Sequence, residues 1–489
     1  MSNKFYGNPV VLLFIFYSIT RLIFAGFLNV QFEYSWVFQM WHFIDIELLK
    51  NKLYESVLYF HYQPPLFNLF LGLIHKQDVI NAKSILMLFY YLITFIMGVI
   101  IYKFSLEMIK SKLLAFIFAV IFYLMPETII YENWPIYTWT SSFLIIISFY
   151  FLRRFNVHKS EKYLHFFFLS QVILVLTRSA FHPVFFICFF LFLLVILKNE
   201  RTKVIKAFSP SALILLTVCM KNLFIFGFFG VGSGLGFSLY KITPKTVDER
   251  NVVDESVYPE IFNIVPVKSI ETYNYTQKGI PEKFKGIEIL NDNFKSTLGQ
   301  YSEEFSVNLG NYHYLDIAKK YQKSAIALIK KYPKEYFKRV FRGVIMYFKP
   351  TWDHGFGAEH NAKVLFPYIN ILTFNNLRLR AENAFVQGEK PWPLKNQIPY
   401  SSYIFIPVIY LILLILLFYN KLIFNKKSIE YLFLIFVTLY LFTVSNLIEL
   451  AENDRYRVMV DPLVYMVFIN LGWSFFRRKN TSGNHESSV

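Results

Sequence analysis

The 489-residue sequence is 55% hydrophobic and 20% aromatic. A soluble domain of this composition would expose large apolar patches, so we expect a membrane protein rather than a soluble one. The formal net charge of +17 could suit a nucleic-acid-binding protein. Much of that charge, however, lies in short connectors between apolar runs, which is the pattern of the positive-inside rule. Cys188 and Cys219 both lie in apolar runs and indicate no disulfide framework.

Ten apolar runs predict helices that cross the membrane. The first, at about 9–30, contains Arg21, which is costly in hydrocarbon and should face protein or water. No small-residue cleavage site follows it, so we expect a retained anchor. The other spans are predicted at about 82–102, 113–131, 135–152, 163–181, 183–197, 208–227, 402–419, 430–448 and 458–475.

The apolar run 64–75 is too short to be a further span. Its 12 residues would form about 18 Å of helix, against a hydrocarbon core of about 30 Å. We expect a juxtamembrane helix that begins at Pro64 and Pro65. With this choice the basic connectors all fall on the N-terminal side, which the positive-inside rule assigns to the cytoplasm. The sequence therefore predicts an all-α polytopic protein of about ten transmembrane helices in the cytoplasmic membrane, with both termini inside.

Three parts follow from this topology. Residues 1–227 form an N-terminal transmembrane module whose first external loop is 31–81, residues 228–400 form an external mixed segment, and residues 401–489 carry the last transmembrane helices. The external segment is polar and has no internal repeat. Within it, PKEYFKRVFRGVIMYF is basic and amphipathic, which is typical of a helix on a membrane surface.

The predicted topology places several polar clusters on the external side. Polar groups beside hydrocarbon are costly and tend to be functional, and arginine forks match phosphate oxygens. We therefore expect one site that combines an acid–base step with an anionic ligand. Its candidate carboxylates are Glu33, Asp45 and Glu132; its candidate phosphate-binding cations are Arg178, Lys221, Arg455 and Arg457; its candidate supporting residues are His61, Gln63, Asn133, His182, Glu449 and Glu452.

Each candidate has a structural alternative. Asp45 would be a solvated residue on an amphipathic helix, Glu132 would only end a helix, and Arg178 and Lys221 would extend to lipid headgroups. No HExxH or CxxC spacing predicts a metal site. The glycine-rich GVGSGLGFS follows a membrane span rather than a strand, so it does not indicate a nucleotide site.

The order of these motifs resembles the GT-C superfamily of membrane glycosyltransferases. An acid follows the first span, and QPPL follows about thirty residues later, as in the protein O-mannosyltransferase and aminoarabinose-transferase type. The longer stretches LLKNKLYESVLYFHYQPPLFNLFLG, LTRSAFHP, KNLFIFGFFG and ENDRYRVMVDPL resemble an uncharacterised bacterial subgroup. The likeness covers most of the membrane part and is weakest in 228–400.

The resemblance implies a GT-C-like fold and an enzyme that transfers a sugar, with inversion, from a polyprenyl-phosphate donor to a glycan, lipid or protein acceptor on the outer face. It implies Glu33 as general base, with Asp45 as a rival. Glu132 is the nearest match to a second acid, although Tyr137 and Thr138 occupy the position where the family carries it. Some superfamily members use a divalent metal, so the resemblance leaves a metal cofactor open.

Two other classes handle the same lipid-linked substrates. A transporter or flippase would show inverted repeats and charges near the bilayer midplane, and the sequence shows no repeat. A polymerase or ligase of lipid-linked glycans would share the donor and differ in the acceptor.

Overall fold

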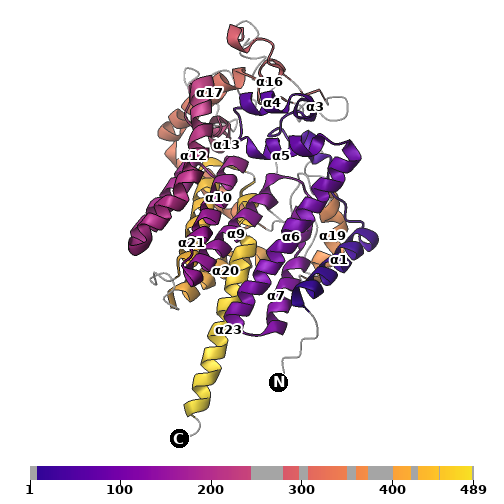
Figure 1. Ribbon diagram of the computed structural model, residues 1–489, viewed down its shortest axis with the longest axis vertical. Helices are drawn as coiled ribbons and strands as arrows, with labels where there is room; N and C mark the ends of the chain where they lie inside the picture. The colour runs from indigo at the N-terminus through magenta and orange to yellow at the C-terminus, as the bar shows by residue number, and fades with distance from the viewer. Residues whose placement is uncertain are drawn as a thin grey trace.

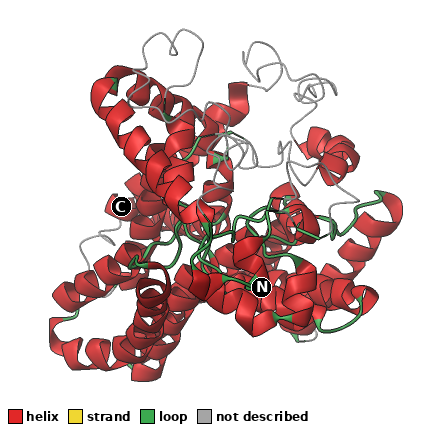
Figure 2. Cartoon of the chain, turned by 90° about the horizontal axis from the view of Figure 1, so that it is seen from above, coloured by secondary structure: helices red, strands yellow, loops and turns green. Residues whose placement is uncertain are grey.

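The computed structural model describes residues 8–243, 279–293, 295–296, 307–349, 359–372, 400–419, 428–450 and 452–486. Within these ranges the chain forms helices and connecting loops and no strand, as Figure 2 shows. The prediction of an all-α protein is confirmed for these ranges. The predicted segment 228–400 is helical in its described parts.

The helices of the first half are α1 (Pro9–Phe27), α2 (Trp36–Gln39), α3 (Ile46–Asn51), α4 (Leu53–Tyr59), α5 (Leu66–His75), α6 (Val79–Ile109), α7 (Lys112–Leu124), α8 (Pro126–Glu132), α9 (Tyr137–His158), α10 (Glu161–Thr177), α11 (Pro183–Ile196), α12 (Arg201–Phe226) and α13 (Leu235–Ile242). Those of the second half are α16 (Glu288–Asn291), α17 (His313–Lys331), α18 (Pro333–Tyr347), α19 (Glu359–Leu372), α20 (Tyr400–Tyr419), α21 (Ile429–Ile448), α22 (Asn453–Val458) and α23 (Asp461–Glu486).

Several of these helices are long and apolar enough to cross a membrane. By length and composition, the described residues contain four such helices, Pro9–Phe27, Val79–Ile109, Lys198–Phe226 and Ile429–Ile448. A fifth candidate is the pair α7 and α8, which are bent by 57° with respect to each other. These helices suit a membrane-embedded protein.

The described residues do not contain the ten spans that were predicted. Two predicted spans correspond to α10 and α11, which have only 17 and 14 residues and fall short of the roughly 20 that a bilayer requires. Two others correspond to α9 and α23, which end in the polar sequences RRFNVH and RRKNTSGNHE. An apolar run therefore overstates the number of spanning helices where a helix is short or continues into charged residues.

The run after the two prolines forms the short helix α5. It has 10 residues, about 15 Å of helix, so it is shorter still than the run from which it was predicted. In Figure 1, α5 lies near α3 and α4 in the upper part of the molecule, whereas α23 reaches its lower end. It packs on both of these helices, which belong to the predicted first loop.

The glycine-rich stretch after α12 is a packing element. The Ser233 amide donates to the His61 carbonyl at 2.8 Å, and the Gly234 amide donates to the Tyr62 carbonyl at 3.2 Å. A Cβ on Gly232 would lie only 2.9 Å from the same Tyr62 carbonyl oxygen. Glycine therefore lets this loop lie directly against the backbone of the first loop.

One glycine of this stretch sits at a close helix crossing, and its substitution tests the packing. A Cβ on Gly236 in α13 would lie 1.9 Å from the Ala318 carbonyl oxygen in α17. We expect Gly236→Ala to destabilise the protein by about 1–3 kcal/mol, because two backbones must separate. Thermal unfolding in detergent measures this. Gly26→Ala is the matched helical control, because a Cβ there meets nothing within 4 Å; equal melting temperatures for the two variants would contradict the crossing.

Candidate functional site

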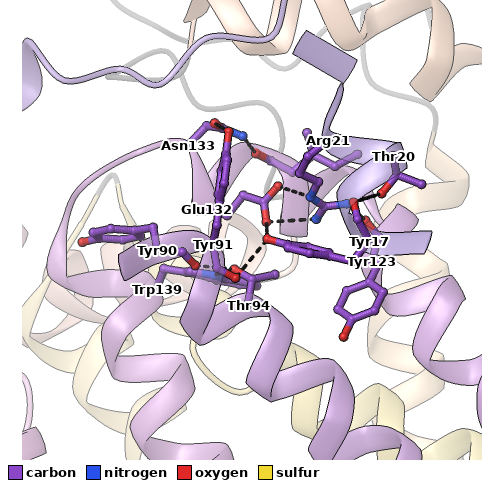
Figure 3. Close-up of polar contacts among 11 residues, drawn as sticks. Tyr17, Thr20, Arg21, Tyr90, Tyr91, Thr94, Tyr123, Glu132, Asn133 and Trp139 are labelled. Atoms are coloured by element: carbon purple, nitrogen blue, oxygen red, sulfur yellow. Dashed lines mark hydrogen bonds and ion pairs between the residues drawn. The ribbon is translucent and has the colours of Figure 1, made fainter. Parts of the chain in front are cut away.

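An ion pair inside the helical bundle joins α1 to the end of α8 (Figure 3). Arg21 Nε lies 2.6 Å from Glu132 Oε1, and Arg21 NH2 donates to Glu132 Oε2 at 2.9 Å. The Tyr17 hydroxyl donates to the same Oε2 at 3.0 Å, and the guanidinium carbon lies 4.2 Å from the centroid of the Tyr17 ring. Arg21 NH1 also donates to the Tyr123 carbonyl in α7 at 2.9 Å.

This arrangement uses both oxygens of Glu132, which was a candidate acid. The side chain is fully buried, and Arg21 is nearly so. A general base needs an oxygen that can reach a substrate proton, whereas this carboxylate already neutralises a buried cation. The geometry supports a role in anchoring α8 to α1. It also accounts for an arginine within the first apolar helix, which was expected to face protein or water.

Asn133, a candidate supporting residue, ends α8 beside this ion pair. Its side-chain amide donates to the Ile129 carbonyl at 2.8 Å, and its Oδ1 accepts the Tyr91 hydroxyl at 3.0 Å. Its carbonyl oxygen accepts the Glu33 amide at 2.8 Å. The turn after α8 is therefore tied to α6 and to the first loop.

Two further candidates also act as tethers. Asp45 caps α3, because its carboxylate accepts the Glu47 amide at 3.1 Å and the Ser296 amide at 2.5 Å. Lys221 donates to two carbonyls at the end of α4, those of Leu58 at 3.0 Å and Phe60 at 3.2 Å. These contacts hold the first loop to its neighbours and leave little of either group for a ligand.

Arg457 is fully buried and bonded within the fold. Its Nε donates to Asp461 Oδ2 at 2.9 Å, and its NH1 donates to the Tyr347 carbonyl at 2.7 Å. These bonds connect α22 with α18 and α23. The geometry supports a structural role for this candidate phosphate ligand.

The candidate histidines also make internal contacts. His61 uses both ring nitrogens, with Nδ1 2.9 Å from Ser233 Oγ and Nε2 3.2 Å from the Asn311 carbonyl oxygen. His182 caps α11, because its Nδ1 accepts the Val184 amide at 3.3 Å.

Glu33 forms no ion pair within the described ranges, and part of its carboxylate also has no hydrogen-bond partner there. The side chain is half-buried, and Oε1 is buried without a hydrogen-bond partner among the described residues. Burial raises the pKa of Glu33, and the positive field of His360 offsets only part of that effect. A carboxyl group with a raised pKa accepts a proton more readily than an exposed glutamate.

Two arginines meet at one hydroxyl group. Arg178 NH1 donates to Thr138 Oγ1 at 3.0 Å, and Arg455 NH2 donates to the same oxygen at 3.4 Å. Arg178 is 5% exposed and Arg455 is 2% exposed. Two buried cations therefore lie side by side, which costs electrostatic free energy unless negative charge offsets it.

The surroundings offset that charge only in part. Arg455 forms an ion pair with Glu452, but within the described ranges Arg178 forms none. Its guanidinium carbon instead lies 4.6 Å from the Tyr456 ring centroid and 5.1 Å from that of Tyr137. Aromatic faces stabilise a cation by about 1–2 kcal/mol, less than an anion would. Arg178 is thus a buried cation that can take an anionic ligand.

Lys241 of α13 adds a third cation beside the arginines. Its Nζ lies 3.3 Å from Glu449 Oε1 and 5.7 Å from the Trp41 ring centroid. Burial opposes the charged form, but Glu449 and Glu452 outweigh it and raise the pKa of Lys241. The lysine is therefore charged throughout the physiological range.

His42 completes the group as a neutral side chain. Burial, reinforced by the charge of Lys241, lowers its pKa to about 3. Gln63 Nε2 lies 3.1 Å from His42 Nδ1, and as an amide nitrogen it can only donate. Nδ1 is then the acceptor, so the ring proton sits on Nε2, and His42 offers an N–H donor.

We call this group the cation cluster. It consists of His42, Gln63, Thr138, Arg178, Lys241, Glu449, Glu452 and Arg455. The sequence had singled out five of its members, Gln63, Arg178, Glu449, Glu452 and Arg455. It gave Thr138 and His42 no role as ligands of an anion. It missed Lys241 altogether, because no sequence motif surrounds this residue.

The turn 133–134 connects the cation cluster with Glu33. Asn133 accepts the Glu33 amide, and the neighbouring Trp134 ring lies 5.1 Å from the Arg455 guanidinium carbon. Trp134 also contacts Trp36, three residues after Glu33, at a centroid distance of 6.1 Å. The arrangement therefore combines a carboxylate of raised pKa with a buried group of cations. Among the described residues no group of three or more His, Cys, Asp or Glu side chains could hold a metal ion.

A double-mutant cycle tests the anchoring role of the Arg21–Glu132 pair. We expect Arg21→Leu or Glu132→Leu alone to destabilise the protein by about 3–5 kcal/mol, because each leaves an unpaired buried charge. The double variant should recover much of that loss, since no charge remains. Unfolding of the unsubstituted protein, the two single variants and the double variant in detergent gives the coupling free energy between the two residues. If the stability lost in the double variant equals the sum of the two single losses, Arg21 and Glu132 do not act as a pair.

No protein-family model matches this chain, and a search of curated proteins finds no match. The function must therefore be argued from the geometry of Glu33 and the cation cluster.

Proposed function

We propose that the chain is an integral-membrane glycosyltransferase of the GT-C type. It would move a sugar from a polyprenyl-phosphate donor to a glycan, lipid or protein acceptor, at the outer face of the cytoplasmic membrane. The observation that carries this proposal is Arg178, a buried cation without a carboxylate partner in the described ranges, next to a second buried arginine.

The cation cluster suits the donor phosphate. Arg178 and Arg455 present two guanidinium groups, which can bind phosphate oxygens in a bidentate manner. The Nε2–H group of His42 is a further donor that carries no charge of its own. As the bond between sugar and phosphate breaks, negative charge grows on the phosphate, and fixed cations in a buried site stabilise it. The phosphate is itself an adequate leaving group, so the reaction needs no nucleotide.

Glu33 suits the role of general base. Its carboxylate takes the proton of an acceptor hydroxyl, whose oxygen attacks the anomeric carbon. One carbon–oxygen bond forms as the bond to the phosphate oxygen breaks, and polyprenyl phosphate leaves with the bonding electron pair. Attack from the face opposite the phosphate inverts the anomeric centre. Of the first-loop acids, Asp45 is the weaker candidate, because its carboxylate caps α3.

The pH dependence of transfer tests Glu33. We expect Glu33→Gln to lower kcat/KM by about 10²-fold or more, in an assay that follows release of polyprenyl phosphate from a polyprenyl-phosphate sugar. The base acts in its ionised form, so the activity of the unsubstituted protein should rise with pH as Glu33 loses its proton. Because burial raises the pKa of Glu33, this rise should occur at a higher pH than for an ordinary glutamate. Normal turnover by the variant would contradict this role. Movement of labelled lipid between leaflets without release of polyprenyl phosphate would support a transporter instead.

The affinity for the donor tests Arg178. We expect Arg178→Leu to raise the donor KM by about 10- to 100-fold, because a charge-assisted hydrogen bond contributes about 1.5–3 kcal/mol. Arg178→Lys should recover part of this loss, since it keeps the charge but not the fork. Exposed Lys162 provides the control, and Lys162→Gln should bind the donor normally. An unchanged donor KM together with a lowered melting temperature would mean that Arg178 is only structural.

A further inference from the structure

One face of α18 packs against no described part of the protein. Phe337 is 63% exposed and Phe341 is 65% exposed, and the two lie one turn apart on the same side of the helix. Beside them lie Lys334, Lys338 and Arg342, which are also spaced at intervals of four and are exposed. The face therefore carries an aromatic stripe next to a basic stripe.

The opposite face of α18 fixes the helix at the end of a candidate membrane span. The Tyr336 hydroxyl donates to the Leu447 carbonyl at 2.8 Å, and the Tyr347 ring lies 5.1 Å from that of Phe442. Gly343 allows a close approach, because a Cβ there would meet Asn446 Oδ1 at 3.1 Å. All three partners lie in the last turns of α21, which ends at Ile448. The free face of α18 is thus held at the level where a spanning helix would leave the hydrocarbon.

The free face combines apolar surface with positive charge. An open, shallow hollow of about 850 Å³ lies along this face and is lined by Pro333, Lys334, Phe337, Lys338, Phe341 and Arg342. The nearby carboxylate of Glu335 pairs with Lys338 at 2.7 Å, so the stripe keeps a net positive charge. Basic residues beside aromatic ones at a membrane boundary fit a lipid whose phosphate is negative and whose chains are apolar.

We infer that this face of α18 binds anionic phospholipid in the leaflet where α21 ends, with Phe337 and Phe341 among the acyl chains and Lys334, Lys338 and Arg342 at the phosphates. The inference does not depend on the proposed sugar transfer, because a transporter would present the same face to the same lipid. It assigns α18 a binding role that is separate from the cation cluster.

Quenching of a tryptophan placed on this face tests the inference. The reporter Phe341→Trp is reconstituted in nanodiscs of phosphatidylcholine that contain a small fraction of either dibrominated phosphatidylglycerol or dibrominated phosphatidylcholine. We expect the brominated anionic lipid to quench the added fluorescence several-fold more strongly at equal mole fraction. Adding Lys334→Glu, Lys338→Glu and Arg342→Glu should remove that preference, since these basic residues supply the attraction to an anionic lipid surface.

The matched control reverses the charge of three exposed lysines on the neighbouring helix α17. Lys319→Glu, Lys323→Glu and Lys330→Glu should leave the preference intact. Equal quenching by the two lipids would overturn the anionic preference, and no quenching by either lipid would show that the face does not meet the bilayer. If the triple reversal on α18 does not fold, the milder Lys334→Gln and Arg342→Gln pair should still lower the preference measurably.

Discussion

The ion pair between Arg21 and Glu132 fixes the turn on which the candidate site is built. In a medium of low dielectric constant, two opposite charges at 2.6 Å hold their helices strongly, because neither can be left unpaired. The residues that follow Glu132 then occupy defined positions. Asn133 binds the Glu33 backbone, Trp134 supports Arg455, and Thr138 holds both arginines of the cation cluster. A contact between α1 and α8 thereby positions groups from the first loop, α10 and α22.

The contacts of each buried charged group distinguish structural residues from candidate ligand-binding residues. Arg457 and Glu132 are paired with opposite charges, and Lys221 is bonded to backbone carbonyls, so the fold itself accounts for them. Arg178 is held by a hydroxyl, a sulfur and two aromatic rings, none of which carries negative charge. Glu33 has a buried oxygen without a partner in the described ranges. Groups whose electrostatic requirements the fold does not meet are the ones that a ligand would complete.

The sequence predicted the helical class and much of the candidate site, but not the details that decide roles. Hydrophobic runs identify apolar helices, yet they do not show where a helix stops, and α10 and α11 end too early for the spans expected of them. Gln63, Arg178 and Arg455 were identified because polar groups near hydrocarbon are costly. Contacts between distant segments, such as the hydrogen bond from Arg457 to the Tyr347 carbonyl, decide which cations are bonded within the fold. No local sequence pattern encodes these contacts. Lys241 was missed for the same reason, since only the packing of α13 brings it to Glu449.

The shared hydroxyl of Thr138 has a consequence for how an anion would leave the site. Two guanidinium groups on one oxygen repel each other, and the ion pair of Arg455 with Glu452 offsets only part of that repulsion. The two arginines are therefore more stable with an anion between them than without one. An anion leaves most readily when a second anion takes its place at the same time. Under the proposed function, turnover would then proceed as an exchange of spent lipid for fresh lipid, with the membrane serving as the reservoir of both.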